Sequence, residues 1–297
     1  MDIRVLQYFL AVAREQSITK AAQALHMTQP PLSRQLKELE EELGKQLLIR
    51  TSKKIILTED GMLLRKRAEE LIDLFEKMQA ELKTPDANLS GEVYIGSGET
   101  QAISLLAKTA ESLHKQGHTI RYRIYSGDAE HVTQRLDQGR IDFGLLIEPV
   151  DIEKYNYIRL PVKDTWGVLM RKDAPLADKA SICAEDLWDK PLIVSHQLFT
   201  SSELSGWFRT DPSKLQIVAT YELIYNASHF VSRGLGYAIS LDHLINTTGE
   251  SDLCFRPLFP LQEAGLCIVW KKHQMFSRAS ALFVRQLQME LQLDPMA

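Results

Sequence analysis

The residues best suited to chemistry lie near the amino terminus, where small polar and basic side chains begin a helical segment. They are Thr28, Gln29, Pro30, Ser33, Arg34 and Lys37. Proline is tolerated in a first helical turn because those N–H groups have no intrahelical acceptor. An arginine fork can bind guanine or phosphate, while glutamine and serine can contact base edges or backbone oxygens. The segment predicts a helix that reads DNA.

Two shorter helices precede this segment and have to position it. The first has Asp2 as N-cap, and the second, Ile18–Leu25, begins after Ser17 and presents small alanines to its neighbours. The inward stripe of the third consists of Leu32, Leu36, Leu39 and Leu43. The pattern is typical of a helix-turn-helix. An ordinary three-helix bundle with solvated polar residues explains it equally well.

A hairpin is predicted next, because two apolar runs within residues 47–58 flank a basic tip. Arg50, Lys53 and Lys54 would meet phosphates beside the groove, strengthening binding to any sequence in a salt-dependent way. Alternatively, the lysines only protect an exposed strand edge.

A long helix from about residue 59 to 83 follows the hairpin and carries a heptad seam. The seam consists of Leu64, Ala68, Leu71, Phe75, Met78 and Leu82, at alternating spacings of four and three. A seam behind a single DNA-reading head predicts two-fold pairing on an inverted repeat. The other interpretation is that the stripe packs against its own chain.

Composition and charge limit the class of protein. The 297 residues are 44% apolar and 25% charged, which excludes collagen-like, disordered and disulfide-scaffold proteins. Residues 1–67 carry 12 Lys/Arg and 8 Asp/Glu, a net charge of +4, which leaves −8 for the remainder. No stretch approaches the ~20 uncharged apolar residues of a membrane span, and three scattered cysteines suit a reducing compartment. We therefore expect a cytoplasmic protein without a membrane partner.

The amino-terminal region resembles the head of the LysR-type transcriptional regulators over about sixty residues. The similarity lies in Leu6-x-x-Phe9, Ser17-Ile18-Thr19-x-Ala21-Ala22-x-x-Leu25, Thr28-Gln29-Pro30-Pro31-Leu32-Ser33, Leu36, Leu39-Glu40, Leu43-Gly44, Leu47-Leu48-x-Arg50 and Leu57-Thr58-x-x-Gly61. Leu48 and Asp60 depart from the family, which usually has phenylalanine and alanine there. The resemblance implies a regulator that binds double-stranded promoter DNA, responds to a small-molecule effector, and assembles as a homodimer, with a tetramer of two dimers favoured.

The rest of the chain predicts an α/β fold. A segment rich in turn formers, residues 84–91, predicts a hinge, after which strands and helices alternate as in a mostly parallel sheet. The resemblance implies two lobes like those of periplasmic binding proteins. The expected domains are therefore a winged helix-turn-helix (1–58), a dimerising linker helix with hinge (59–91), and a two-lobed effector domain (92–297). Lobe I is expected at about 92–162 and 268–297, and lobe II at about 163–267.

Strand ends in these lobes supply the candidate effector site. Ser97, Thr100 and Gln101 lie where a strand meets a helix start, and the resemblance places an effector-binding hydroxyl at Thr100. Ser195, His196 and Phe199 lie at the matching mouth of the second lobe. Free N–H groups and the helix dipole favour an anion there, whereas Glu99 opposes one. For Ser97 and Thr100, helix capping is an equally good interpretation.

Other chemistries find little support. His114 and His118 are four residues apart, but Gly117 lies between them and no third ligand accompanies them. The chain lacks a Gly-x-Ser-x-Gly elbow, and Gly96-x-Gly98 lacks the third glycine of a dinucleotide fingerprint. We therefore expect no enzyme, no cofactor and no metal. A solute-binding protein and an α/β enzyme with a regulatory head are the competing hypotheses.

Overall fold

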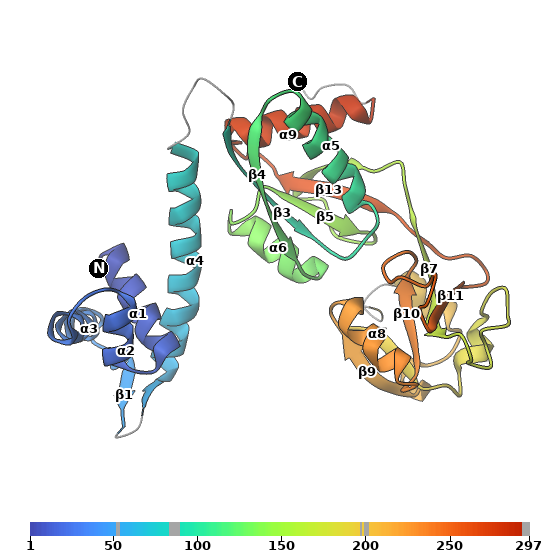
Figure 1. The fold of residues 1–297 in the computed structure, drawn as a ribbon, viewed down its shortest axis with the longest axis horizontal. Helices are drawn as coiled ribbons and strands as arrows, with labels where there is room; N and C mark the ends of the chain where they lie inside the picture. The colour runs from blue at the N-terminus through green and yellow to red at the C-terminus, as the bar shows by residue number, and fades with distance from the viewer. Residues whose placement is uncertain (52–53, 83–89, 197, 199–201, 293–297) are drawn as a thin grey trace. The chain divides into compact units, whose positions relative to one another are not determined.

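The computed structural model describes residues 1–51, 54–82, 90–196, 198 and 202–292, which divide into two compact units, Met1–Lys83 and Thr84–Ala297 (Figure 1). The first unit, the head, contains both the expected DNA-binding region and the long helix. Its elements are α1 (Ile3–Glu15), α2 (Ile18–Ala24), α3 (Gln29–Leu43), β1 (Leu48–Arg50), β2 (Ile55–Leu57) and α4 (Glu59–Leu82).

Local sequence explains where the helices of the head begin and end. The Asp2 carboxylate accepts the N–H of Arg4, and the Ser17 hydroxyl accepts the N–H of Lys20, so each caps a helix as expected. Gly44 ends α3 in the left-handed conformation, with φ of 62°. The apolar faces of α1, α2 and α3 meet in one core. It is formed mainly by Phe9, Val12, Ala21, Leu32, Leu36, Leu39 and Leu47.

A glycine fixes the start of α4 against the hairpin. A Cβ at Gly61 would overlap the carbonyl oxygen of Leu47, so no other residue fits there without movement. The strands β1 and β2 pair antiparallel, from Leu48 opposite Leu57 to Arg50 opposite Ile55. The predicted wing is therefore present on the head.

The second unit contains two sheets, each the centre of one lobe. Lobe I has five strands in the order β4-β3-β5-β13-β6. These are β3 (Ser90–Ser97), β4 (Thr119–Ser126), β5 (Phe143–Ile147), β6 (Tyr155–Arg159) and β13 (Leu266–Lys271), with helices α5 (Ile103–Lys115), α6 (Ala129–Asp137) and α9 (Arg278–Glu290). The first three strands run parallel, whereas β13 lies antiparallel to both β5 and β6.

Lobe II has strands in the order β11-β7-β10-β8-β9, and β12 also pairs with β7. They are β7 (Asp164–Arg171), β8 (Leu192–Ser195), β9 (Ile217–Tyr221), β10 (Tyr237–Leu241), β11 (Leu253–Pro257) and β12 (Glu263–Ala264), with helices α7 (Ser202–Trp207) and α8 (Ile224–Ser232) and 3-10 turns at Ala184–Leu187 and Pro212–Lys214. The chain passes between the lobes twice, from β6 to β7 and from β12 to β13 (Figure 1). Because β13 begins at Leu266, the return to lobe I comes two residues before the expected boundary.

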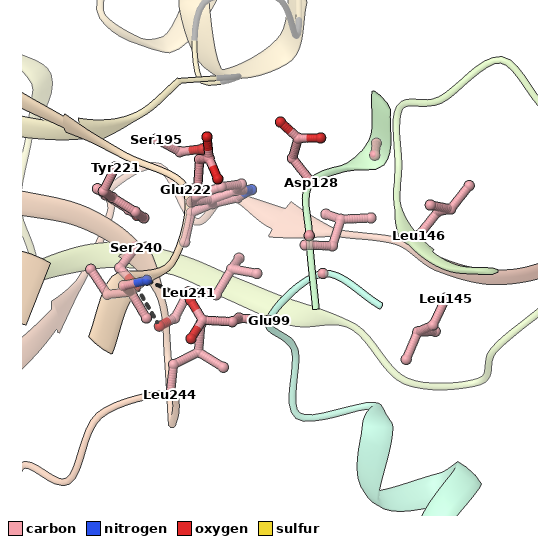
Figure 2. Close-up of a pocket in the computed structure, with 16 residues that line it drawn as sticks. Glu99, Asp128, Leu145, Leu146, Ser195, Tyr221, Glu222, Ser240, Leu241 and Leu244 are labelled. Carbon is pink, nitrogen blue, oxygen red and sulfur yellow. Dashed lines mark hydrogen bonds between the residues drawn. The ribbon is translucent and has the colours of Figure 1, made fainter. Parts of the chain in front are cut away.

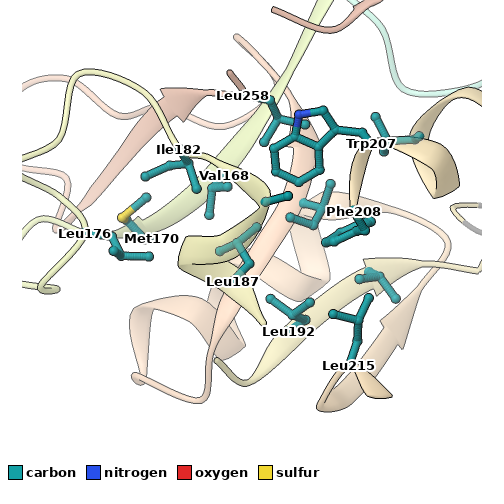
Figure 3. Close-up of a cluster of buried hydrophobic side chains, with 14 of the residues drawn as sticks. Val168, Met170, Leu176, Ile182, Leu187, Leu192, Trp207, Phe208, Leu215 and Leu258 are labelled. Carbon is teal, nitrogen blue, oxygen red and sulfur yellow. The ribbon is translucent and has the colours of Figure 1, made fainter. Parts of the chain in front are cut away.

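Alternation along the strands puts a separate apolar cluster on each face of each sheet. In lobe I, Leu145 packs in the cluster under α5 and α9, whereas Leu146 packs in the cluster under α6. In lobe II, Val168 and Met170 pack with Trp207 and Phe208 on one face (Figure 3), and other residues of the sheet pack with α8 on the opposite face. Both sheets are therefore covered on two sides, which holds their strand ends in fixed positions.

Removal of a large side chain from the core of lobe I should destabilise the protein. Phe143 is fully buried, with its ring centroid 5.1 Å from that of Phe276 and 5.6 Å from that of Phe283. We expect Phe143→Ala to lower the free energy of unfolding by about 3–5 kcal/mol, measured by chemical denaturation. The matched control is Phe230→Ala. Because Phe230 is 53% exposed, the loss of its ring should lower the free energy of unfolding by about 0.5 kcal/mol or less. Equal losses in the two variants would contradict the assigned core.

Candidate nucleic-acid interface and effector pocket

The start of α3 presents the predicted DNA-reading residues on one accessible surface. Thr28 is the N-cap and makes no side-chain capping bond, and Gln29 and Pro30 are exposed beside it. Arg34 is 81% exposed and its Nε lies 2.7 Å from Glu38 Oε1. Lys37, also exposed, pairs with a glutamate one helical turn further on. Since exposed pairs contribute only about 0.2–1 kcal/mol, these cations can exchange their partners for phosphates.

The hairpin brings further basic side chains to the same surface. Arg50 Nη1 donates to Ser33 Oγ at 3.4 Å, which joins the base of the wing to α3. Lys54 is exposed, and its backbone closes the hairpin with Thr51, whose hydroxyl donates to the Lys54 carbonyl at 2.7 Å. Lys53 lies outside the described residues. Arg50 and the α3 residues therefore form one polar and basic face, and Lys54 is exposed on the wing.

The predicted heptad seam of α4 is divided between two environments. Leu64 packs against the core of the head and Ala68 is fully buried, so the first part of the seam is used within the chain. Leu71, Met78 and Leu82 are 47%, 45% and 79% exposed. The interpretation that the stripe packs against its own chain thus holds for the first part, whereas the exposed second part leaves the predicted dimerisation a prediction.

A pocket lies between the lobes at the ends of their strands and contains about 590 Å³ of space, including the part that opens to solvent (Figure 2). Lobe I contributes the turn after β3, the start of α6 and the end of β5. Lobe II contributes the start of β7, the ends of β8, β9 and β10, and the start of α8. The lining residues are Gly98, Glu99, Gly127, Asp128, Ala129, Leu145, Leu146, Ile147, Trp166, Ser195, Tyr221, Glu222, Ile224, Ser240, Leu241 and Leu244.

Of the predicted effector residues, Ser195 lines this pocket and the other described ones do not. Ser97 is buried and donates to the carbonyl of Gly98 at 2.6 Å. Thr100 is buried, accepts the N–H of Ala102 and donates to Asp164 Oδ2 at 2.5 Å. His196 is exposed away from the lining, and Phe199 lies outside the described residues.

Thr100 and Gln101 connect the lobes instead of lining the pocket, and Glu99, which does line it, makes a further contact between the lobes. Gln101 Nε2 donates to the carbonyl of His243 at 2.5 Å, next to a separate cavity. Glu99 Oε2 accepts the N–H of Ile224 at 2.5 Å. Three consecutive residues of lobe I therefore bind three different elements of lobe II. Neither Thr100 nor Gln101 lines the inter-lobe pocket, and their role in binding an effector stays a prediction.

Glu99 supplies a helix cap that lobe II lacks. The N-cap of α8 is Leu223, whose side chain accepts no hydrogen bond, so the first N–H groups of the helix need another acceptor. The Glu99 carboxylate takes this position from the opposite lobe. Burial raises the pKa of Glu99, although the backbone N–H groups of Ile224 and Tyr225 oppose the shift. Burial likewise raises the pKa of Asp164, the partner of Thr100.

Sequence reasoning missed Trp166, Tyr221 and Glu222, which all line the pocket. Tyr221 ends β9 and Glu222 follows it, so the rule that ligands bind beyond the carboxyl ends of strands indicates both positions. Trp166 lies near the start of antiparallel β7 and no such rule reaches it. Among the described residues, no group of three or more His, Cys, Asp or Glu is arranged to hold a metal ion. The same part of the chain contains no helix with the length and apolarity to cross a bilayer.

The raised pKa of Glu99 predicts how stability depends on pH. A carboxyl whose pKa is higher in the folded than in the unfolded chain contributes most below the unfolded value, and that contribution is lost as pH rises through the folded value. We expect Glu99→Gln to remove this loss. The free energy of unfolding of the variant should therefore rise relative to that of the parent protein as the pH increases above about 4.3, the unfolded value for a glutamate. Urea titrations across this range measure the difference. A constant difference from the parent at every pH would contradict the assigned burial, and Glu130→Gln, an exposed carboxyl on α6, is the control.

Two family models match the chain. Residues 3–62 match the bacterial regulatory helix-turn-helix protein, lysR family, and residues 86–292 match the LysR substrate binding domain. The uncharacterized regulator YvbU of Bacillus subtilis (strain 168) is 30% identical over 240 residues, which cover 80% of this chain and 81% of that one. The Hca operon transcriptional activator HcaR of Escherichia coli (strain K12) is 27% identical over 282 residues, covering 93% of each. The regulator BsdA of B. subtilis is 39% identical, but the match spans only 48% of this chain and 49% of that one.

Solved structures share the fold. Full-length CbnR complexed with its target DNA is 19% identical, with a TM-score of 0.77, over 97% of this chain and 99% of the other. Full-length BenM is 26% identical over the whole of both chains, with a TM-score of 0.53. The solved structures confirm the fold class, and the family models and relatives confirm the resemblance and the expectation that the chain is not an enzyme. The chain belongs to the LysR family of transcriptional regulators.

Proposed function

We propose that this regulator binds an inverted repeat in promoter DNA as a homodimer or a tetramer of two dimers, acting in the cytoplasm, and that a small molecule in the inter-lobe pocket changes the geometry of the oligomer. The observation that carries the proposal is the polar and basic face formed by α3 and the wing. There, the side chains suited to base and phosphate contacts are exposed together. The net charge of +4 on residues 1–67 favours the approach of DNA.

Pairing of two heads is supported by the uncovered part of α4. One recognition helix reads only a few base pairs, so a second copy on the next half-site adds both affinity and specificity. Leu71, Met78 and Leu82 continue a heptad seam in exposed positions, which a second α4 would cover.

Coupling to an effector requires a pocket whose shape differs between two arrangements of the lobes. The pocket is lined by both lobes, so a ligand that fills it contacts both. Such a ligand shifts the equilibrium only by its difference in affinity for the two arrangements. The predicted anionic effector has little support from the lining, which presents Glu99, Asp128 and Glu222.

Loss of a DNA-reading arginine should weaken binding. We expect Arg34→Ala to cost about 1–3 kcal/mol of binding free energy at the preferred sequence and to relax specificity there. Lys53→Ala should weaken binding equally for all sequences and lower the salt slope by about one. The matched control is Lys115→Ala, which removes an exposed cation paired to Glu111 within a helix of the effector domain. Binding isotherms of Arg34→Ala and Lys53→Ala that coincide with the parent would count against this surface.

Polar substitution in the exposed seam should separate the dimer. We expect the double variant Leu71→Gln, Met78→Gln to sediment as a monomer at concentrations where the parent is oligomeric, because the apolar contact is lost. Glu69→Gln, Glu76→Gln is the control, with the same seven-residue spacing on the opposite face of α4. An oligomeric Leu71/Met78 variant would show that the chains pair elsewhere.

A further inference from the structure

We propose that the effector of this regulator is a cation, an amine or guanidinium compound with a short apolar chain. The inference rests on the proposed function, in which the inter-lobe pocket is the effector site, and specifies the ligand of that pocket. It reverses the charge expected from the sequence.

The charges on the pocket wall all have one sign. Three carboxylates line it, those of Glu99, Asp128 and Glu222, and the described lining contains no lysine, arginine or histidine. An anionic ligand would enter this space without a charged partner.

The helix N-termini at the pocket are already occupied by carboxylates of the chain. Asp128 is the N-cap of α6, and its Oδ1 accepts the N–H of His131 at 2.8 Å. Glu99 caps α8 from the opposite lobe. Just before α5, the Thr100 hydroxyl accepts the N–H of Ala102. At each of these positions, which attract anions in many proteins, a side-chain oxygen of the chain already accepts a backbone N–H.

The charge balance remains negative after the helix dipoles are counted. Each helix N-terminus is equivalent to roughly half a positive charge, so two of them leave about two of the three negative charges uncompensated. Burial raises the pKa of Glu99, which makes its charge the weakest contributor of the three. Asp128 has one further neighbour, since His131 Nδ1 lies 2.7 Å from its Oδ1. Glu222 is exposed, and no hydrogen bond or ion pair to it is found in the described part of the chain.

The two stronger contributors lie on opposite lobes. Asp128 precedes α6 in lobe I, Glu222 follows β9 in lobe II, and both carboxylates belong to the wall of one pocket (Figure 2). A cation between them relieves the repulsion of like charges and favours the closed arrangement of the lobes. The charge of the ligand is thereby coupled to lobe movement, which the proposed regulation requires.

The uncharged lining suits an amine with a short hydrocarbon chain. Leu145, Leu146 and Leu241 supply apolar surface, while the rings of Trp166 and Tyr221 can face a cation. The Tyr221 hydroxyl donates to the carbonyl of Ile239 at 2.6 Å, which fixes the ring in its place.

A set of probes with equal chain length tests the sign of the charge. Calorimetric titration of the full-length protein uses 1,5-diaminopentane, pentane-1,5-diol and glutarate. We expect the diamine to bind with a dissociation constant at least tenfold below that of the diol, and glutarate to bind more weakly than either. Tighter binding of glutarate than of the diamine, or no heat of binding from the diamine, would overturn the inference.

Variants locate the binding in the pocket. Asp128→Asn with Glu222→Gln should weaken diamine binding at least tenfold, and asparagine keeps the cap on α6. Glu130→Gln removes an exposed carboxyl outside the pocket lining and should change nothing. Diamine binding that survives the double substitution would also overturn the inference. DNA binding is measured on the same preparation. Absence of diamine binding with DNA binding intact overturns this inference alone, whereas absence of DNA binding overturns the proposed function.

Discussion

The uncovered apolar seam on α4 is the constraint on which the regulatory account depends. Leu64 and Ala68 attach the helix firmly to the head, while Leu71, Met78 and Leu82 leave apolar surface in water. Since apolar burial yields about 25 cal/mol per Å², this surface favours a second copy. In the proposed dimer, α4 belongs to the head and also pairs with the partner's α4, so it would fix the separation of two recognition helices and transmit a change in oligomer geometry to the DNA.

In the effector domain, three consecutive residues of lobe I make hydrogen bonds to lobe II. Glu99, Thr100 and Gln101 each bind a different element of lobe II, two of them through buried or half-buried carboxyl groups. A buried charge is costly unless it is well paired, and burial raises the pKa of both Glu99 and Asp164 accordingly. Two of the contacts between the lobes therefore involve carboxyl groups whose charged form is disfavoured by burial.

Local patterns predicted much of this structure because they encode local physics. The caps Asp2 and Ser17, the leucine stripe of α3 and the wing strands follow from short-range rules, and so does the alternation of strands and helices in the effector domain. The short strands β6, β11 and β12 are defined instead by their pairing with β13 and β7. Pairing between distant segments leaves little signal in a single sequence.

The pocket lies at strand ends, where the sequence placed the candidate effector site, but of the predicted residues in the described part of the chain only Ser195 lines it. Thr100 and Glu99 instead make hydrogen bonds to lobe II, which depend on the tertiary fold. The charge of the site depends on which side chains reach across from the other lobe, and spacing along the chain does not encode this.

Selection from a pool of random duplex DNA tests the central claim most directly. Fragments retained by the purified full-length protein are sequenced after several rounds at moderate ionic strength. The account predicts enrichment of an inverted repeat whose half-sites are separated by whole helical turns, because two heads joined through α4 dock on one face of the duplex. A pool without enriched sequences, or with a single unrepeated site, would contradict it.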